Sequence, residues 1–294
     1  MLDNRSFLSK LRAYLGFAGP SMAIFSLVVI LPILFGVYLT FTDWDGIAVT
    51  KHFVGLKNYA ALFADADFWS SLWLTIRYVF ICVILINLVA FFLAYALTSG
   101  VRGQNFLRAG FFTPNLIGGV ILGFIWQFLF SRVTVQLYQT IPLSILQTSW
   151  LSNPSTAFLA LVIVTVWQYA GYMLLIYISG FVSVPTELLE AARIDGANER
   201  QATLHIRLPL MVPSFVICIF LSITRCFKVY DLNISLTGGG PYNSTELVAM
   251  HIYTKAFEEH QYGVGQAEAI VLFLIMAAIA LTQVYIGKKM EVEA

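Results

Sequence analysis

The amino-acid sequence predicts an all-α polytopic membrane protein with six transmembrane helices. Of its 294 residues, 59% are hydrophobic and only 11% are charged, whereas roughly a quarter of the residues in a soluble domain are charged. The mean hydropathy is +0.80, and apolar stretches of about 20 residues, long enough to cross the hydrocarbon of a bilayer as a helix, recur along the chain. The net charge of +1 argues against nucleic-acid binding, which needs a concentrated basic surface.

Six apolar stretches are predicted to cross the membrane, and together they form one domain over residues 1–294. The first stretch is longer than the core of a signal peptide, which has about 7–15 residues, and no small-residue cleavage site ends it. We therefore expect it to remain as a helix. In chain order the predicted spans are residues 17–40, 73–97, 110–130, 157–180, 210–230 and 265–287.

The third and fifth spans are less regular than the others. The third contains Pro114 and the Gly118–Gly119 pair, which predict a bent or broken helix whose freed backbone groups bond to neighbouring helices. The fifth contains Arg225 and Lys228. Because a lone cation at the bilayer centre costs about 2.5–3.5 kcal/mol, these side chains are expected to face water or partners. Lys228 and Asp231, three residues apart on a helix, are expected to pair near its outer end.

The distribution of basic residues predicts that both termini lie in the cytoplasm, where positively charged loops are retained. With this orientation ten Lys and Arg residues, from Arg5 to Lys289, are cytoplasmic, and four (Lys51, Lys57, Arg132 and Lys255) are outside. Two outer segments, 53–73 and 245–263, mix aromatic and charged residues at helical spacing. They are expected to be interfacial helices at the headgroups or a docking surface for an extracytoplasmic partner.

A charged loop, residues 183–209, separates the fourth and fifth spans on the cytoplasmic side. Pro185 is suited to the first turn of a helix, Gly196 is suited to end that helix, and Asn198 can cap a second short helix. Pro209 marks the return to the membrane. One interpretation is a solvated connection between spans. The other is a rigid projection that inserts into a cleft of a cytoplasmic protein, because Ala191 and Ala192 permit close approach.

The charged loop resembles the EAA motif of the permease subunits of bacterial ABC importers. The matching residues are Glu190-Ala191-Ala192, Gly196 and the run from Ile206 to Pro209. Segments 53–69, 113–130 and 227–257 are similar to those of carbohydrate-uptake permeases, above all the maltose-transporter F-type subunit, without its large extra outer domain. The resemblance implies that the residues that dock onto an ATPase subunit are Glu190, Ala191, Ala192, Asp195 and Gly196.

The same resemblance implies the partners of a transport complex in the bacterial cytoplasmic membrane. These are a second permease subunit, two ATP-binding subunits, an extracytoplasmic solute-binding protein, a sugar and membrane lipid. The chain has no phosphate-binding loop of its own, because no lysine follows Gly238-Gly239-Gly240-Pro241. We therefore expect no catalytic residue and no bound cofactor here, with ATP and Mg²⁺ on the partner subunits. Cys82, Cys218 and Cys226 show no metal-ligand spacing.

Polar and aromatic residues at membrane depth are candidates for the substrate pathway, because sugars are bound through their hydroxyl groups and ring faces. By the resemblance, Tyr172 takes the position of a cavity tyrosine. The alternatives are a permease for a polyol, glycerol-phosphate or acidic sugar, or an ion-coupled transporter, for which the spans offer only Asp231 and Glu268, both near outer ends. The six candidate pathway residues are Trp167, Gln168, Tyr169, Tyr172, Ser222 and Arg225.

Overall fold

The computed structural model describes residues 7–290, and the described residues are almost entirely helical, with a single isolated bridge between Thr42 and Phe53. Five helices are long and apolar enough to cross a membrane, or six if a bent pair is counted as one span. The all-α prediction is therefore confirmed. Arg5, used above to predict the orientation, lies outside the described residues. The chain divides into two compact units, residues 1–65 with 252–271 and residues 66–251 with 272–294.

The first unit begins with three consecutive helical segments, α1 (Phe7–Phe25), η1 (Ser26–Ile30) and α2 (Leu31–Leu39). Residues 15–39 of this run can span a membrane, which matches the predicted span 17–40. The middle segment η1 is π-helical. Pro32 lacks an N–H group for the turn before it, and the wider turns of η1 accommodate this proline within an otherwise continuous helix.

The same unit contains the short helix α3 (Lys57–Ala64), the π-helical segment η7 (Thr254–Glu258) and the start of α15 (Tyr262–Met290). Asn58 Nδ2 donates to the carbonyl oxygens of Thr40 and Thr42, each at 2.8 Å, and so fixes the chain after α2. Helix α14 (Val248–Tyr253) precedes η7, so the two segments predicted to lie outside the membrane are both largely helical.

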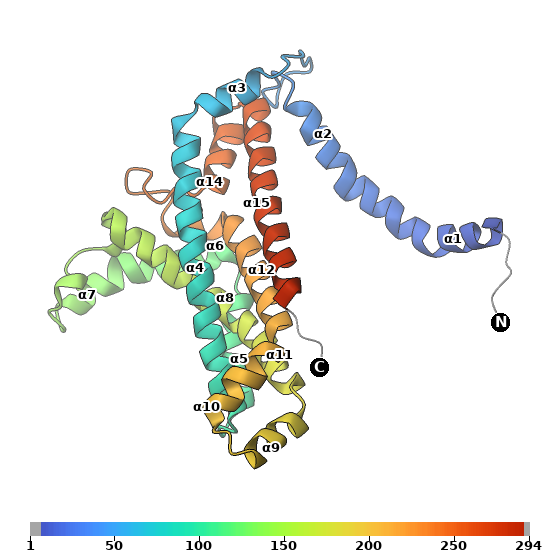
Figure 1. Ribbon diagram of the computed structural model, residues 1–294. Coiled ribbons are helices and arrows are strands. Elements are labelled where there is room, and N and C mark those ends of the chain that lie inside the picture. Colours follow the sequence, from blue (N-terminus) through green and yellow to red (C-terminus); the bar gives the residue numbers. More distant parts are fainter. Residues whose placement is uncertain (1–6, 291–294) are drawn as a thin grey trace. The chain divides into compact units, whose positions relative to one another are not determined.

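The second unit is built on the paired long helices α4 (Ala66–Thr98) and α8 (Pro154–Ser183), with α12 (Val212–Phe227) against both (Figure 1). The side chain of Asn153 accepts from the N–H of Ser155 at 2.9 Å and caps α8, and Pro154 occupies its first turn. The predicted spans 73–97 and 157–180 lie within these two helices. All three cysteines, one on α4 and two on α12, are buried free thiols and pack as small hydrophobic side chains.

A buried polar network joins the three central helices. Tyr177 Oη donates to Asn87 Oδ1 at 2.7 Å, and Asn87 Nδ2 donates to Ser222 Oγ at 3.2 Å. Ser222 in turn donates to the carbonyl of Cys218 at 2.7 Å. Because no water is present at membrane depth to replace these bonds, each group depends on its protein partner.

The predicted third span is broken where Pro114 and Gly118 are found. Helix α5 (Gln104–Phe112) leads into the 3-10 turn η2 (Thr113–Leu116), Ile117 is extended, and α6 (Gly119–Phe128) begins a new direction. The prediction of a break is confirmed, but the limits 110–130 are wrong. The stretch long enough to span runs from Gly119 to Tyr138, through η3 (Leu129–Val133) and α7 (Thr134–Tyr138). Short 3-10 turns η4 (Ser144–Leu146) and η5 (Trp150–Ser152) connect it to α8.

The fifth span is also discontinuous. The short helix α11 (Leu208–Leu210) meets α12 at Met211, where the axis bends by 65°, and α12 ends at Phe227, before the short helix α13 (Asp231–Leu236). The predicted span 210–230 contains α12, but the helix ends at Phe227 and not at the predicted limit of 230. Lys228 and Asp231 lie on either side of this break and form no ion pair within the described part of the chain, so the predicted pairing is wrong.

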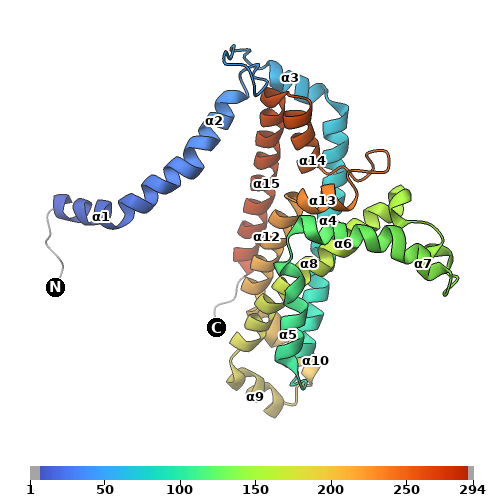
Figure 2. The ribbon, with the colours of Figure 1, turned by 180° about the vertical axis from the view of Figure 1, so that it is seen from behind.

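Helix α13 packs closely against α6 (Figure 2). A Cβ atom at Gly123 would lie 1.8 Å from Ser235 Oγ, and one at Gly119 would lie 2.9 Å from Asp231 Cβ. The glycines of α6 therefore allow the two helical segments that follow the chain breaks to approach each other closely.

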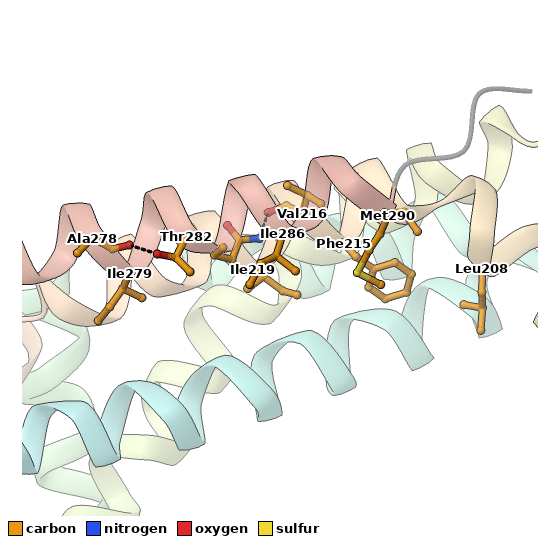
Figure 3. Close-up of a pocket in the computed structure, with 12 residues that line it drawn as sticks. Leu208, Phe215, Val216, Ile219, Ala278, Ile279, Thr282, Ile286 and Met290 are labelled. Carbon is orange, nitrogen blue, oxygen red and sulfur yellow. Dashed lines mark hydrogen bonds between the residues drawn. The ribbon is translucent and has the colours of Figure 1, made fainter.

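The second half of α15 lies along α12 and leaves an apolar groove of about 760 Å³ (Figure 3). The donors of its two polar side chains bond to backbone carbonyls: Gln283 Nε2 donates to that of Val216 at 3.1 Å and Thr282 Oγ1 to that of Ala278 at 2.7 Å, whereas Gln283 Oε1 is buried without a hydrogen-bond partner among the described residues. The exposed lining is therefore apolar, as expected for a helix surface within a membrane.

Candidate functional site

The charged loop folds as two short helices separated by a tight turn. Helix α9 (Thr186–Ile194) follows Pro185, and α10 (Glu199–Ala202) is capped by Asn198, whose side chain accepts from the N–H of Gln201 at 3.0 Å. Gly196 between them has a φ of +83°, a left-handed conformation that favours glycine. The predicted helix end at Gly196 and cap at Asn198 are both confirmed.

A carboxylate that sequence reasoning missed joins the two halves of this loop. Glu199 contacts the guanidinium groups of Arg207, in η6 (Thr203–Arg207), and of Arg193, in α9, the latter at 3.7 Å. The hydrogen bond from Arg207 and the charges of both arginines lower the pKa of Glu199 below its usual value. At neutral pH these two ion pairs therefore connect the segments on either side of the turn.

The proposed docking residues lie together on the surface of the loop. Glu190, Ala191, Asp195 and Gly196 are exposed and Ala192 is half-buried. The neighbouring Ile194 is 87% exposed and adds an apolar side chain to this surface. A hollow of about 310 Å³ lies beside them, lined by residues from Asp195 to Ile206. Helices α9 and α10 lie at the end of this unit where α4 and α8 end (Figure 1), so the surface is open to a partner.

A second group of residues gathers where the two broken helices meet. Arg225, near the end of α12, donates from Nη1 to Asn115 Oδ1 in the break between α5 and α6, at 2.6 Å. Its guanidinium carbon lies 4.5 Å from the ring centre of Tyr172 and 5.1 Å from that of Tyr169, both on α8. Within the described residues no carboxylate lies within ion-pair distance of Arg225. The aromatic faces and the amide oxygen therefore stabilise its charge.

The six candidate pathway residues do not all join this group. Tyr169, Tyr172 and Arg225 form it together with Asn115. Gln168 lies beside it and donates to the carbonyl of Ile117 at 3.1 Å, which satisfies a backbone group freed by the break.

The other two candidates lie elsewhere. Trp167 points to another face of α8, where it packs edge-on against Trp126 at 5.5 Å. Ser222 is fully buried in the network of Asn87. Asn115 was missed from the sequence, where its position between Pro114 and the glycine pair was the available signal.

The family model and the related sequences all place this chain in the same protein family. Residues 66–292 match the model of the binding-protein-dependent transport system inner membrane component. The chain is 43% identical, over 94% of both chains, to a probable starch degradation products transport system permease protein of Thermoanaerobacterium thermosulfurigenes. It is 31% identical to a multiple sugar-binding transport system permease protein of Streptococcus mutans, over 89% of this chain and 90% of that protein.

The fold has a counterpart among solved structures. A chain of a bacterial ABC transporter involved in the import of alginate superposes with a TM-score of 0.82 at 17% identity, covering 96% of this chain and 98% of the other. Together with the apolar helices and the charged loop, these matches show that the chain is a multi-pass membrane protein and belongs to the family of inner membrane components, or permeases, of binding-protein-dependent transport systems.

Proposed function

We propose that this chain is the membrane-spanning subunit of an ATP-driven importer of oligosaccharides or related glycosides. The proposal is carried by the charged loop. Its two halves are joined by the ion pairs of Glu199, and its residues 190–196 form a largely exposed surface. The sugar substrate is supported by relatives whose names refer to starch degradation products, multiple sugars and trehalose or maltose.

The complex proposed here contains four further components besides this chain. A second permease completes the pathway, two ATP-binding subunits bind ATP and Mg²⁺, and an extracytoplasmic protein delivers the sugar. A related alginate transporter was solved with its periplasmic protein bound, which supports the last of these. No cofactor is assigned to this chain. In this arrangement the charged loop and both termini lie on the cytoplasmic side of a bacterial cell membrane.

The docking surface transmits the movement of the ATPase into the membrane helices. The ATP-binding subunit contacts the docking residues Glu190, Ala191, Ala192, Asp195 and Gly196. The salt bridges of Glu199 help the two halves of the loop to move together. Because α11 leads directly from this loop into α12, a displacement of the loop displaces the helix that carries Arg225. Alternating access follows from that rocking, without any covalent chemistry in this chain.

The Arg225 group forms part of the sugar pathway. Tyr169 and Tyr172 offer ring faces, and the guanidinium has four N–H groups besides the one that is bonded to Asn115. Discontinuous helices at membrane depth are common in transporter binding sites because they present unpaired polar groups. Gln168 holds the backbone at the helix break through its bond to Ile117. Trp167 and Ser222 support the pathway through their contacts with Trp126 and Asn87 and are not assigned a contact with the sugar.

Coupling is tested by the variant Glu190→Ala in the assembled transporter. Stimulation of ATP hydrolysis by the sugar-loaded binding protein is expected to fall at least tenfold, with membrane insertion unchanged. Glu187→Ala, the same substitution one turn earlier on α9 at an exposed residue outside the proposed docking set, is the matched control and should retain stimulation. Normal coupling in both Glu190→Ala and Gly196→Pro would show that the docking assignment is wrong.

The substrate pathway is tested by comparing Tyr172→Phe with Tyr172→Ala, together with Arg225→Ala. The phenylalanine variant retains the ring that faces Arg225 and should transport sugar far better than the alanine variant. Wild-type uptake in both alanine variants would remove these residues from the pathway. Screening which sugar-loaded binding protein stimulates ATP hydrolysis then identifies the substrate.

An acidic sugar remains the second candidate because Arg225 has no carboxylate partner among the described residues. Stimulation by a binding protein loaded with a uronic-acid oligosaccharide, and not with a neutral one, would favour it. A polyol or glycerol-phosphate substrate would be identified by the same screen of loaded binding proteins.

A further inference from the structure

A pocket of about 280 Å³ lies between the end of α4 and the second half of the charged loop. Phe91, Phe92 and Tyr95 of α4 form one side, and Arg200, Thr203 and Leu204 form the other. None of these residues belongs to the docking surface or to the Arg225 group. The pocket is therefore separate from both candidate sites.

The floor of the pocket is held in place by aromatic rings that pack against one another in tilted orientations. The ring of Phe91 lies 5.4 Å from that of Phe181 and 5.5 Å from that of Phe215, and the ring of Tyr95 lies 5.9 Å from that of Phe181. These contacts fix the floor against the central helices, so the pocket is a preformed feature of the fold.

The open side of the pocket is apolar and continues a row of exposed apolar side chains on α4 formed by Phe80, Ile84 and Leu88. Phe92 is 64% exposed and Leu204 is 59% exposed. Phe92 lies six residues before the end of α4 at Thr98, which is about 9 Å along a helix. It therefore lies close to the level at which hydrocarbon gives way to lipid headgroups.

The rim of the pocket is cationic and carries a hydroxyl donor. Arg200 is exposed, and within the described residues it forms no ion pair. Thr203 Oγ1 accepts from Arg207 Nη1 at 3.2 Å, which leaves the hydroxyl hydrogen of Thr203 available to another acceptor. Arg207 is itself neutralised by Glu199, so Arg200 provides the uncompensated charge.

We propose that this pocket binds one anionic phospholipid. An acyl chain lies over Phe92 and Leu204, and the phosphate accepts from Arg200 and Thr203. An apolar surface within reach of the acyl chains, with one cation at headgroup level, matches the two parts of such a lipid. A free phosphate ion would leave the aromatic floor exposed, and a protein partner would have to reach Phe92 through the lipid. The site is independent of the transported sugar.

The test measures lipid bound to the purified full-length chain in detergent by native mass spectrometry, during titration with phosphatidylglycerol or phosphatidylcholine. One phosphatidylglycerol should bind in preference to phosphatidylcholine, and Arg200→Gln should weaken its binding about fivefold, as expected for one arginine near a headgroup. Phe92→Ser should also weaken binding. Arg102→Gln removes another exposed arginine, in the turn after α4, and should leave binding unchanged.

Three results would overturn the proposal. Equal binding of the two lipids would show that the phosphate charge is not recognised, and equal losses in Arg200→Gln and Arg102→Gln would indicate diffuse attraction instead of a site. Displacement of the lipid by millimolar inorganic phosphate would show that the aromatic floor contributes nothing. Thermal unfolding of each variant in phosphatidylcholine should match that of the wild type, which confirms that the variants are folded.

Discussion

Gly171 of α8 is the position at which a single methyl group should disturb the Arg225 group most directly. A Cβ atom there would lie 1.8 Å from the carbonyl oxygen of Phe111 and 2.5 Å from its carbonyl carbon. Ordinary contact requires about 3.4 Å, so α5 would have to move by roughly 1.5 Å. Because the clash involves backbone atoms that cannot rotate away, Gly171→Ala should cost about 3 kcal/mol, at the upper end of the range for overpacking.

The same displacement of α5 carries Asn115 away from Arg225, since η2 follows α5 directly. The 2.6 Å hydrogen bond between them would then be lost. We expect Gly171→Ala to lower the unfolding temperature of the purified protein by about 6–12 °C and to reduce sugar uptake. The fall in uptake should exceed any loss of the protein from the membrane.

Gly110, on α5, is the matched control because a Cβ atom there would meet nothing within 4 Å. Gly110→Ala should be neutral or should stabilise α5 by up to about 1 kcal/mol, the difference in helix propensity. Both variants are measured by thermal unfolding in the same detergent. Equal unfolding temperatures for the two would refute the close packing of α5 on α8.

Three further predictions follow from the loop and the buried network. The pKa of Glu199 is lowered, so its salt bridges contribute fully to stability above its ordinary pKa of 4.5 and are lost only as the pH falls through the lower pKa of the folded state. The rate of hydrogen exchange in residues 196–202, corrected for intrinsic rates, should therefore be the same at pH 7 and pH 5.5. In Glu199→Gln the exchange of these residues should be faster at pH 7. Gly196→Ala should destabilise the turn by about 1–2 kcal/mol through its φ of +83°, whereas Gly196→Asn should cost less, and equal hydrogen-exchange rates in the two would contradict this. Asn87→Leu should cost about 1–3 kcal/mol by leaving the Tyr177 hydroxyl unpaired, and adding Tyr177→Phe should recover part of the loss in thermal unfolding.

Most of the fold could be predicted from the sequence because its elements are encoded locally. Long apolar runs mark α4, α8 and α15, and Gly196 and Asn198 mark the turn and cap of the charged loop. Pro114 and the following glycines mark the broken third span. Each of these signals depends on residues within a few positions of one another, and each is expressed in the structure as expected.

The parts that sequence reasoning missed depend on contacts between distant residues. Asn115 and Arg225 are separated by 110 positions, and no local pattern shows that two helix breaks meet. The expected pairing of Lys228 with Asp231 assumed a continuous helix, but the helix ends at Phe227. No local pattern marks Glu199, because its two arginine partners approach it only after the turn at Gly196 has formed.

Helix α12 connects the two candidate sites through a single rigid segment. Its first turn follows Met211, whose N–H bonds back to the carbonyl of Arg207 at 2.9 Å, and Arg207 is the residue that binds Glu199 of the loop. Arg225 lies 14 residues beyond Met211, about 21 Å along the helix. If the loop tilts α12, the far end of the helix and with it Arg225 are displaced. A tilt of about 4° over this length moves Arg225 by roughly 1.5 Å. We therefore expect a small movement of the loop to lengthen the 2.6 Å bond between Arg225 and Asn115 beyond hydrogen-bond distance.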